Sequence, residues 1–529
     1  MSTHSSYRGC NGPVTGTTSG PLPSIFNDVI GPVMRGPSSS HCAASVRIGR
    51  LARDLMEGSI ESVLIEFDPN GSLATTHDGQ GSDMGLFGGL LGWDAADERL
   101  VDSERAIKEA GIKVEIAIRD FQASHPNTYK LTLTNSNEQH VLIANSTGGG
   151  MIELVSLDGI AFQSFGDYHE TLIQTSSDPA TILKALGEDW DGVTVHGDGT
   201  YLVQVRGQQF VEPSVLDGLD IDNVFRLRPV LPVSSRKDMA VPFLTCDEML
   251  SDPKNGARSL SELAIDFESE RGGLTHDSVV QKMIGIVQLL QRSIKEGVTG
   301  TEFEDRILHF QCGKFKEELD AGRLLDSGML NLMVLYVTAL MEVKSSMGII
   351  VAAPTAGSCG ALPGACLAAG EVMGWSEETM ARGMLAAGLI GVFVTARSSF
   401  AAEVTGCQGE TGVGAAMAAA ALVDMHGGPV KQALAAASMA LQNTLGLVCD
   451  PVANRVEVPC LGRNISAAAN ALTSANIALA DFAEVIPLDE VIATHNTIGR
   501  GLPRELRCTC LGGLSITESA RKIERRLAR

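Results

Sequence analysis

Two cysteines in the C-terminal half of the chain raise the first chemical question. Cys449 and Cys460 lie on either side of an Asp-Pro pair in GLVCDPVANRVEVPC, and Cys407 lies between glycines in AEVTGCQGETGVG. A thiolate at a helix N-terminus is favoured by the helix dipole, so Cys407 is a candidate metal ligand. Free cysteines are also common as small buried hydrophobic residues. Their spacing matches neither a zinc finger nor a ferredoxin, so the residues alone leave core packing, a disulfide and a metal site open.

The remaining cysteines show no complete ligand pattern. Cys359 and Cys366 lie in an apolar segment rich in Gly and Ala, where we expect small buried side chains. Cys508 and Cys510, in RCTCLGGL, are close enough to share a metal but lack a second pair. The first residues of the chain contain no apolar signal-like core, so we expect a cytoplasmic protein. In that reducing compartment we expect metal-binding or catalytic roles for cysteine rather than disulfides.

A run of hydroxyl groups near the N-terminus is a candidate binding loop. Ser38, Ser39, Ser40 and His41 follow a Gly-Pro turn in RGPSSSHCAAS and precede a stretch with helical periodicity at 45–56. Hydroxyls and free amides at a helix start can hold a carboxylate or a phosphate. The alternative is an N-cap, but a cap needs one serine rather than three. We therefore favour a binding role.

A second Gly-rich turn carries further polar groups. The stretch GSLATTHDGQGSDMG places His77, Asp78, Gln80 and Asp83 within a few residues of one another. Either His41 or His77 could act as a general base, although a single histidine in a loop is more often simply solvated.

The elements around these motifs predict two kinds of structure. Residues 63–68, 111–118 and 129–135 alternate as half-buried strands do, and together with the helix at 45–56 they indicate an α+β domain. From about residue 245 the chain becomes helical and strongly apolar, with many Ala and Gly residues. Helices that are apolar on every side belong in the middle of an all-helical core. We expect such helices at 330–343, 384–396, 414–425 and 433–446, and before them a helix at 277–297 with an apolar residue at nearly every third or fourth position.

Length and charge set outer limits. With 529 residues the chain is expected to be multidomain, and its formal net charge of −22 argues against nucleic acid and anionic membranes as partners. The uncharged stretch from Ser345 to Gly370 contains two prolines, so we interpret it as buried loop and helix. We expect a disordered tail at 1–22, an α+β domain at 23–170, a connector with strand-like segments at 171–240 and a helical domain at 241–529.

Taken in order, the motifs resemble a known family. GPVMRGPSSSH, GSLATTHDGQGSD, NSTGGGMIELV, SSMGIIVAAPTAGSCGALPG, GCQGETG and GLVCDPVANRVEVPC are similar to motifs of the iron–sulfur L-serine dehydratases, also called L-serine ammonia-lyases. The resemblance runs from about residue 24 to 515. It covers both domains of the family, here fused in one chain.

The resemblance implies a cofactor and a reaction. Members of the family bind a [4Fe–4S] cluster through three cysteines, and the matching positions are Cys407, Cys449 and Cys460. The fourth iron would bind the carboxylate and β-hydroxyl of the substrate as a Lewis acid. A base would remove the α-proton, and the resulting enamine would hydrolyse to pyruvate and ammonia. The loop from Ser38 to His41 would face the cluster across the domain interface and hold the substrate carboxylate.

The chain departs from the family pattern in three places. Cys42 replaces the threonine that usually follows Ser-Ser-Ser-His. The Gly-His-Gly-Thr-Asp turn, whose histidine is the family's presumed base, here has Gln80 and Ser82, which we still expect to contact substrate. Glutamine cannot take a proton near neutral pH, so His77 or His41 would have to serve as the base. The last residues also lack the terminal cysteine with which some relatives cap the free iron.

These departures keep alternative functions open. L-Serine is the expected substrate because most of the family uses it. A cluster-dependent dehydratase of another β-hydroxy acid, like the 2-(hydroxymethyl)glutarate dehydratases, is a second hypothesis. A non-catalytic iron–sulfur sensor is a third. Members of the family commonly form dimers, and the helices rich in Ala and Gly could supply a homodimer interface.

Overall fold

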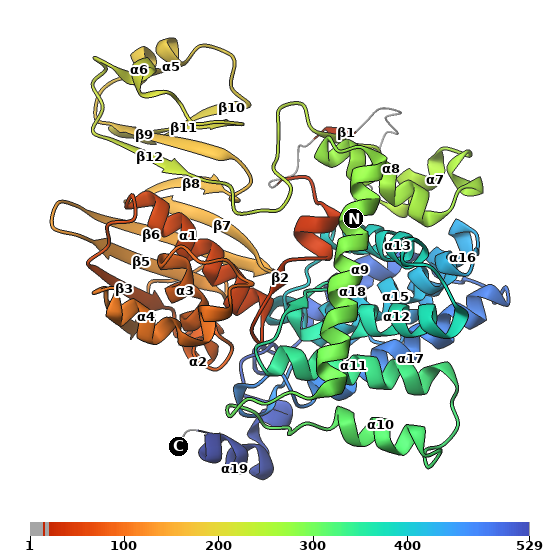
Figure 1. Cartoon of the computed structure of the whole chain (residues 1–529). Helices are drawn as coiled ribbons and strands as arrows, with labels where there is room; N and C mark the ends of the chain where they lie inside the picture. The colour runs from red at the N-terminus through yellow and green to blue at the C-terminus, as the bar shows by residue number, and fades with distance from the viewer. Residues whose placement is uncertain (1–13, 16–20, 528–529) are drawn as a thin grey trace, which may run out of the picture.

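Three parts follow one another along the chain. The computed structural model describes residues 14–15 and 21–527, so most of the tail predicted at 1–22 lies outside the described residues. A six-stranded sheet with helices, a four-stranded sheet and a large helical part are arranged as Figure 1 shows. The protein is therefore multidomain, with a mixed α/β N-terminal region and a helical C-terminal region, as the sequence predicted.

The first sheet has the strand order β4-β3-β5-β6-β7-β8, and all its pairs are antiparallel except the parallel pair β3–β4. Its strands are β3 (Ser62–Phe67), β4 (Lys113–Ile118), β5 (Thr128–Thr134), β6 (Gln139–Gly148), β7 (Met151–Leu157) and β8 (Ile160–Ser164). The strands predicted from alternating hydrophobicity, β3, β4 and β5, are confirmed to within one or two residues.

Short helices on one face of this sheet carry the two polar loops. Helix α1 (Ala44–Leu55) begins directly after the serine loop, and α2 (Leu73–Thr76) leads into the second Gly-rich turn. Helices α3 (Ser82–Leu90) and α4 (Ser103–Glu109) pack beside them (Figure 1). A Cβ atom at Gly89 would lie 2.2 Å from the carbonyl oxygen of Val46, so glycine is what allows α3 to approach α1 so closely. This packing fixes the two loops relative to each other.

The strand-like pieces of the middle segment form a second sheet, which packs on the core of the first sheet through residues such as Leu172 and Phe225. The segment consists of β9 (His169–Thr175), α5 (Ala180–Leu186), β10 (Gly192–Asp198), β11 (Thr200–Gly207), α6 (Pro213–Leu216) and β12 (Asn223–Leu227). The strands pair antiparallel in the order β10-β11-β9-β12. Ile173, Val203 and Val205 help to form a small core of its own beneath the two helices.

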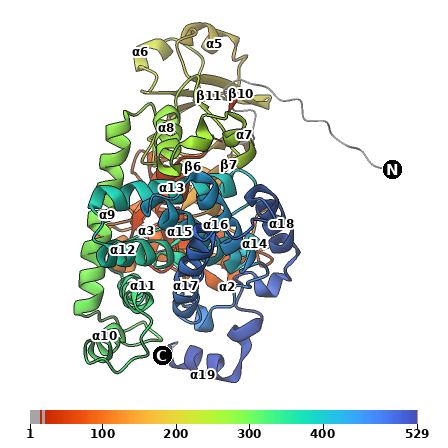
Figure 2. The same cartoon turned by 90° about the vertical axis from the view of Figure 1, so that its right-hand side faces the viewer.

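The helical part holds the largest core. Its helices are α7 (Cys246–Ser251), α8 (Leu260–Gly272), α9 (His276–Thr299), α10 (Cys312–Asp320), α11 (Met329–Ser345), α12 (Ala361–Met373), α13 (Glu377–Thr395), α14 (Ala402–Thr405), α15 (Thr411–Met425), α16 (Val430–Gln442), α17 (Cys460–Leu479), α18 (Leu488–Gly501) and α19 (Glu518–Leu527). Helices α13 and α15 lie at its centre with α12, α16 and α17 around them (Figure 2). Each predicted apolar helix is found, and the segment 345–370 is loop, short strand and helix.

One helix in the described part of the chain is long and apolar enough to cross a membrane. Helix α13 meets the criterion by length and composition, but 78% of its apolar window is buried inside the protein. It is surrounded by α8, α9 and α15, so its apolar surface serves the core of the helical part.

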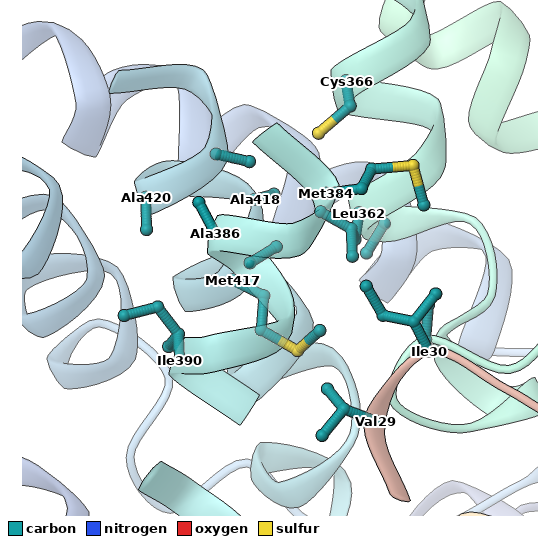
Figure 3. Packing of buried hydrophobic residues seen from close by; sticks show 14 of the residues in the cluster. Val29, Ile30, Leu362, Cys366, Met384, Ala386, Ile390, Met417, Ala418 and Ala420 are labelled. Atoms are coloured by element: carbon teal, nitrogen blue, oxygen red, sulfur yellow. The ribbon is translucent and has the colours of Figure 1, made fainter. Parts of the chain in front are cut away.

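The N-terminal segment of the chain joins the two regions. Residues 22–34 pack into the helical core rather than against the first sheet. The short helical turn η1 (Ile25–Val29) lies on α13, and Val29 and Ile30 are among the core side chains of the helical part (Figure 3). Strand β2 (Val33–Met34) then pairs with β14 (Ile350–Val351). The chain leaves this pairing directly into the serine loop, which therefore starts at the boundary between the regions.

Two glycines test how tightly this contact is packed. A Cβ atom at Gly391 would lie 2.1 Å from Cγ1 of Val29, whereas one at Gly285, on the exposed side of α9, meets no atom within 4 Å. We expect Gly391→Ala to lower the free energy of unfolding by about 1–3 kcal/mol because it overpacks the core. Gly285→Ala should instead raise it by roughly 0.5–1 kcal/mol through helix propensity. Denaturant unfolding of the two variants measures the difference, and equal effects would contradict the packing argument.

Candidate functional site

The serine loop faces the helical part of the protein. Ser39 Oγ accepts a hydrogen bond from the backbone N–H of Ala356 at 3.1 Å, and Ser40 Oγ donates to Oε1 of Glu403 at 3.0 Å. All the loop side chains from 38 to 41 are buried. Ser38 occupies the N-cap position of the helical turn η2 (Ser39–Ala43), which runs directly into α1, but its side chain makes no capping hydrogen bond. An N-cap thus accounts for the position of Ser38, whereas the hydroxyls of Ser39 and Ser40 contact the helical part.

The hydrogen bonds around His41 define its tautomer. Thr76 Oγ1 donates its one hydrogen to the carbonyl oxygen of Ser72 at 2.8 Å, so it must accept from Nε2 of His41, also at 2.8 Å. Nε2 of His41 therefore carries the proton. In the neutral ring Nδ1 then keeps its lone pair, which faces the hydroxyl of Ser38 at 3.0 Å and Oε1 of Glu403 at 3.5 Å. Burial lowers the pKa of His41, with the charge of Glu403 opposing it, so the neutral ring is favoured.

The surroundings of His77 shift its pKa in the direction opposite to that of His41. Its Nδ1 lies 2.7 and 2.9 Å from the two carboxylate oxygens of Asp83, and its ring stacks on Phe67 with centroids 5.0 Å apart. Burial works to lower the pKa of His77, but the hydrogen bond and charge of Asp83 outweigh it and raise the pKa above its ordinary value. His77 is therefore a histidine that holds its proton more firmly than His41 does.

Gln80 and Ser82, the two departures in the second Gly-rich turn, are both buried. The side-chain amide of Gln80 donates to Oδ1 of Asn454 at 3.0 Å and to Sγ of Cys508 at 3.4 Å. The hydroxyl of Ser82 pairs with that of Tyr129 at 2.9 Å. Gln80 thus lies against the cysteine-bearing loops, whereas Ser82 is held by the sheet of its own region.

Two of the three candidate ligand thiols meet directly. The sulfurs of Cys407 and Cys449 and a carboxylate oxygen of Glu410 all lie within 4.8 Å of one another, a separation that could hold a metal ion. Cys407 begins the turn before α15 and Cys460 is the first residue of α17, so two of the thiols lie at helix starts. Cys407, Cys449 and Cys460 are all buried and free. The neighbouring thiols Cys407 and Cys508, followed by burial, raise the pKa of Cys449.

A fourth thiol lies against this group. The backbone N–H of Cys449 donates to Leu506 at 2.8 Å, and that of Cys508 donates to the carbonyl oxygen of Cys449 at 3.0 Å. These bonds hold Cys508 beside Cys449, and both thiols belong to one buried cluster with Cys407. Cys510 instead approaches carbonyl groups of Pro451 and Asn454. The sequence alone could not choose between these two cysteines.

The remaining predicted cysteines fill space. Cys359 lies 3.8 Å from the sulfur of Met341, and Cys366 points into the apolar core beside Leu362 and Met384 (Figure 3). Burial raises the pKa of both thiols, to about 11 for Cys359. Their interpretation as small buried side chains is confirmed.

Charged residues that the sequence did not single out surround the thiols. Arg463 donates to Sγ of Cys407 at 3.3 Å and to Asp450 at 2.7 Å, and the buried ammonium of Lys344 donates to the carbonyl oxygen of Val456. Burial raises the pKa of Glu410 to about 7, opposed by its hydrogen bond from Thr355. Cations beside sulfur favour the thiolate over the thiol. The glutamates flanking GCQG, at positions 403 and 410, were the available sequence signal.

Comparison with known proteins agrees with this geometry. Residues 250–515 match the family model described as serine dehydratase alpha chain. The chain is 35% identical over 285 residues to the probable L-serine dehydratase alpha chain of Bacillus subtilis (strain 168), covering 54% of this chain and 95% of that protein. The chain belongs to the serine dehydratase family.

Two further relatives show how the regions of this serine dehydratase family member are joined. The L-serine dehydratase of Streptomyces coelicolor is 29% identical over 495 residues, which covers 91% of this chain and 96% of that protein. The probable L-serine dehydratase beta chain of Bacillus subtilis is 40% identical over 150 residues, or 28% of this chain and 67% of that protein. The chain is thus a single-chain form in which both family regions are fused.

Proposed function

We propose that this chain is an iron–sulfur-dependent dehydratase that converts L-serine to pyruvate and ammonia. The proposal rests on a contact between the serine loop of the N-terminal region and the cysteine-bearing helical region. Ser40 donates a hydrogen bond to Glu403, which lies four residues before the thiol Cys407. A buried base, a hydroxyl-rich loop and a group of thiols therefore share one site. The L-serine dehydratases among the relatives support the substrate.

The donor set fits an iron–sulfur group. Thiolates are the ligands that such clusters take, and Cys407, Cys449 and Cys460 are buried, free and close to the cations Arg463 and Lys344. We propose that these three cysteines hold a [4Fe–4S] cluster. When bound, the cluster supplies a Lewis acid that withdraws charge from the carboxylate and β-hydroxyl of the substrate.

The chain's own residues then provide the proton chemistry. Nδ1 of His41 is the base that takes the α-proton, because it keeps its lone pair and its ring is neutral. The hydroxyl of Ser38 donates to this lone pair at 3.0 Å and must turn away before the α-proton is taken, and Oε1 of Glu403, 3.5 Å from Nδ1, then stabilises the protonated ring. Loss of the α-proton and of the β-hydroxyl, which together make one molecule of water, gives an enamine, whose imine form reacts with water to give pyruvate and ammonia. Gln80 holds Asn454 and Cys508 in place and takes no proton.

Gln80 also favours a second candidate function. With glutamine at the position of the family's presumed base, another β-hydroxy acid could be dehydrated without release of ammonia, as in a 2-(hydroxymethyl)glutarate-like enzyme. A non-catalytic iron–sulfur sensor would bind the cluster and turn over neither substrate.

One assay separates these functions. Protein purified without oxygen should convert L-serine to equal amounts of pyruvate and ammonia. Formation of an unsaturated acid from other β-hydroxy acids, with no ammonia and no reaction of L-serine, would refute the proposal in favour of the second candidate. A protein that holds iron and sulfide but turns over none of these substrates would be the sensor.

A further inference from the structure

A small cavity lies beside the thiols, at the boundary between the two regions. Its volume is about 230 Å³, and its lining includes Ser72, His125, Glu403, Arg504, Arg507 and Thr509. Pockets for drug-sized ligands are larger, roughly 300–1,000 Å³, so this cavity suits a small molecule. Glu403 connects it to the serine loop, and Thr509 directly follows Cys508. A molecule in this cavity would therefore lie next to the proposed reaction site.

Glu403, a lining residue of this cavity, has an unused acceptor. Its side chain is 1% exposed, and Oε1 accepts from Ser40 at 3.0 Å. Within the described part of the chain, Oε2 is buried and has no hydrogen-bond partner. A buried carboxylate oxygen without a partner is costly, so a ligand that donates hydrogen bonds there would be stabilised.

Arg507, which also lines the cavity, presents an unused donor. Nε of Arg507 is buried and has no partner among the described residues, and the one contact of its guanidinium group is a long 3.5 Å bond from Nη1 to the carbonyl oxygen of Val404. No carboxylate in residues 21–527 lies within ion-pair distance of Arg507. Guanidinium groups bind carboxylates through two parallel hydrogen bonds, so Arg507 suits a ligand carboxylate.

The two groups together define a class of ligand. They are opposite in charge and line the same cavity, yet they do not pair with each other. His125 does not add a competing cation, because burial lowers its pKa. A molecule that binds both groups carries an ammonium for Glu403 and a carboxylate for Arg507 close together, as a free α-amino acid does.

We propose that this cavity is the zwitterion-binding subsite of the enzyme, in which Arg507 binds the α-carboxylate and Glu403 the α-ammonium group. This inference rests on the proposed function and deepens it, since it selects amino acids over simple hydroxy acids. It also reassigns the carboxylate from the serine loop to Arg507, because the hydroxyls of Ser38 and Ser40 are already donated to His41 and Glu403.

Two half-substrates test the assignment on the anaerobically purified holoenzyme. 3-Hydroxypropionate lacks the ammonium group of serine and ethanolamine lacks its carboxylate. Titration calorimetry measures the affinity for each probe. Arg507→Met should lower the affinity for 3-hydroxypropionate by about 10–100-fold and leave the affinity for ethanolamine unchanged. Glu403→Gln should lower the affinity for ethanolamine and leave that for 3-hydroxypropionate unchanged. Arg507→Lys keeps the positive charge but not the two parallel N–H donors, so it should lower the affinity for 3-hydroxypropionate less than Arg507→Met does.

Arg504→Met is the matched control. Arg504 lines the same cavity, but its guanidinium group already donates to the carbonyl oxygens of Asn70 and Pro69, at 3.2 Å each. Equal loss of both probes in Arg507→Met, or an equal effect of Arg504→Met, would overturn the assignment. The crossed pattern without turnover of L-serine would support this subsite and refute the proposed function. Turnover of L-serine with unchanged probe binding in Arg507→Met would do the reverse.

Discussion

Replacing Cys449 by serine should remove both the iron–sulfur group and the activity. Cys449 is buried, and its sulfur lies within 4.8 Å of the ligand atoms of Cys407 and Glu410. A serine hydroxyl is a poor ligand for iron in such a cluster, so protein purified without oxygen should be colourless and nearly free of iron and sulfide. Because a Lewis acid contributes several kcal/mol, activity should fall by at least about 10³-fold.

Cys510→Ser is the control for this prediction. Cys510 is two residues from Cys508, but its sulfur approaches carbonyl groups of Pro451 and Asn454 instead of the other thiols. The variant should keep the brown absorbance and the iron content of the original protein. If Cys449→Ser retained its iron and sulfide, or if Cys510→Ser lost them equally, the assignment of the ligand cysteines would be wrong.

The elements of the fold could be predicted because their patterns are local. Strand β5 alternates buried and half-buried residues, and α15 is apolar on every side because it is surrounded by α12, α13, α16 and α17. Both patterns appear within a few residues of sequence. The packing of residues 22–34 into the helical core could not be predicted in this way. It depends on contacts such as that of Ser24 with Glu268, 244 positions away.

The candidate site was predictable to a similar degree. The serine loop, the histidines and the thiols could be found from residue types and motifs, but their hydrogen bonds could not. Glu403 and Arg507 were missed because nothing near them in the sequence shows that they line one cavity. Cys508 was left open because its contact with Cys449 depends on a backbone pairing between two loops.

His41→Ala should lower kcat by about 10²–10⁴-fold, the usual contribution of a general base. Its Nδ1 keeps a lone pair in the neutral ring, since Nε2 donates to Thr76. His77→Ala should have a much smaller effect, because Asp83 holds the Nδ1 proton of His77 and raises its pKa. Cluster content must be measured in both variants, so that a loss of iron is not mistaken for a loss of the base.

The pH dependence of kcat/KM identifies the base independently of any variant. A base acts in its neutral form, so activity falls as the pH drops through its pKa in the free enzyme. Burial lowers the pKa of His41 below its ordinary value of 6.5, whereas the pKa of His77 is raised above 6.5. If His41 is the base, the acid limb should have its midpoint below 6.5, and activity should persist in mildly acidic solution. A midpoint above 6.5, combined with a large loss in His77→Ala, would transfer the role to the His77–Asp83 pair.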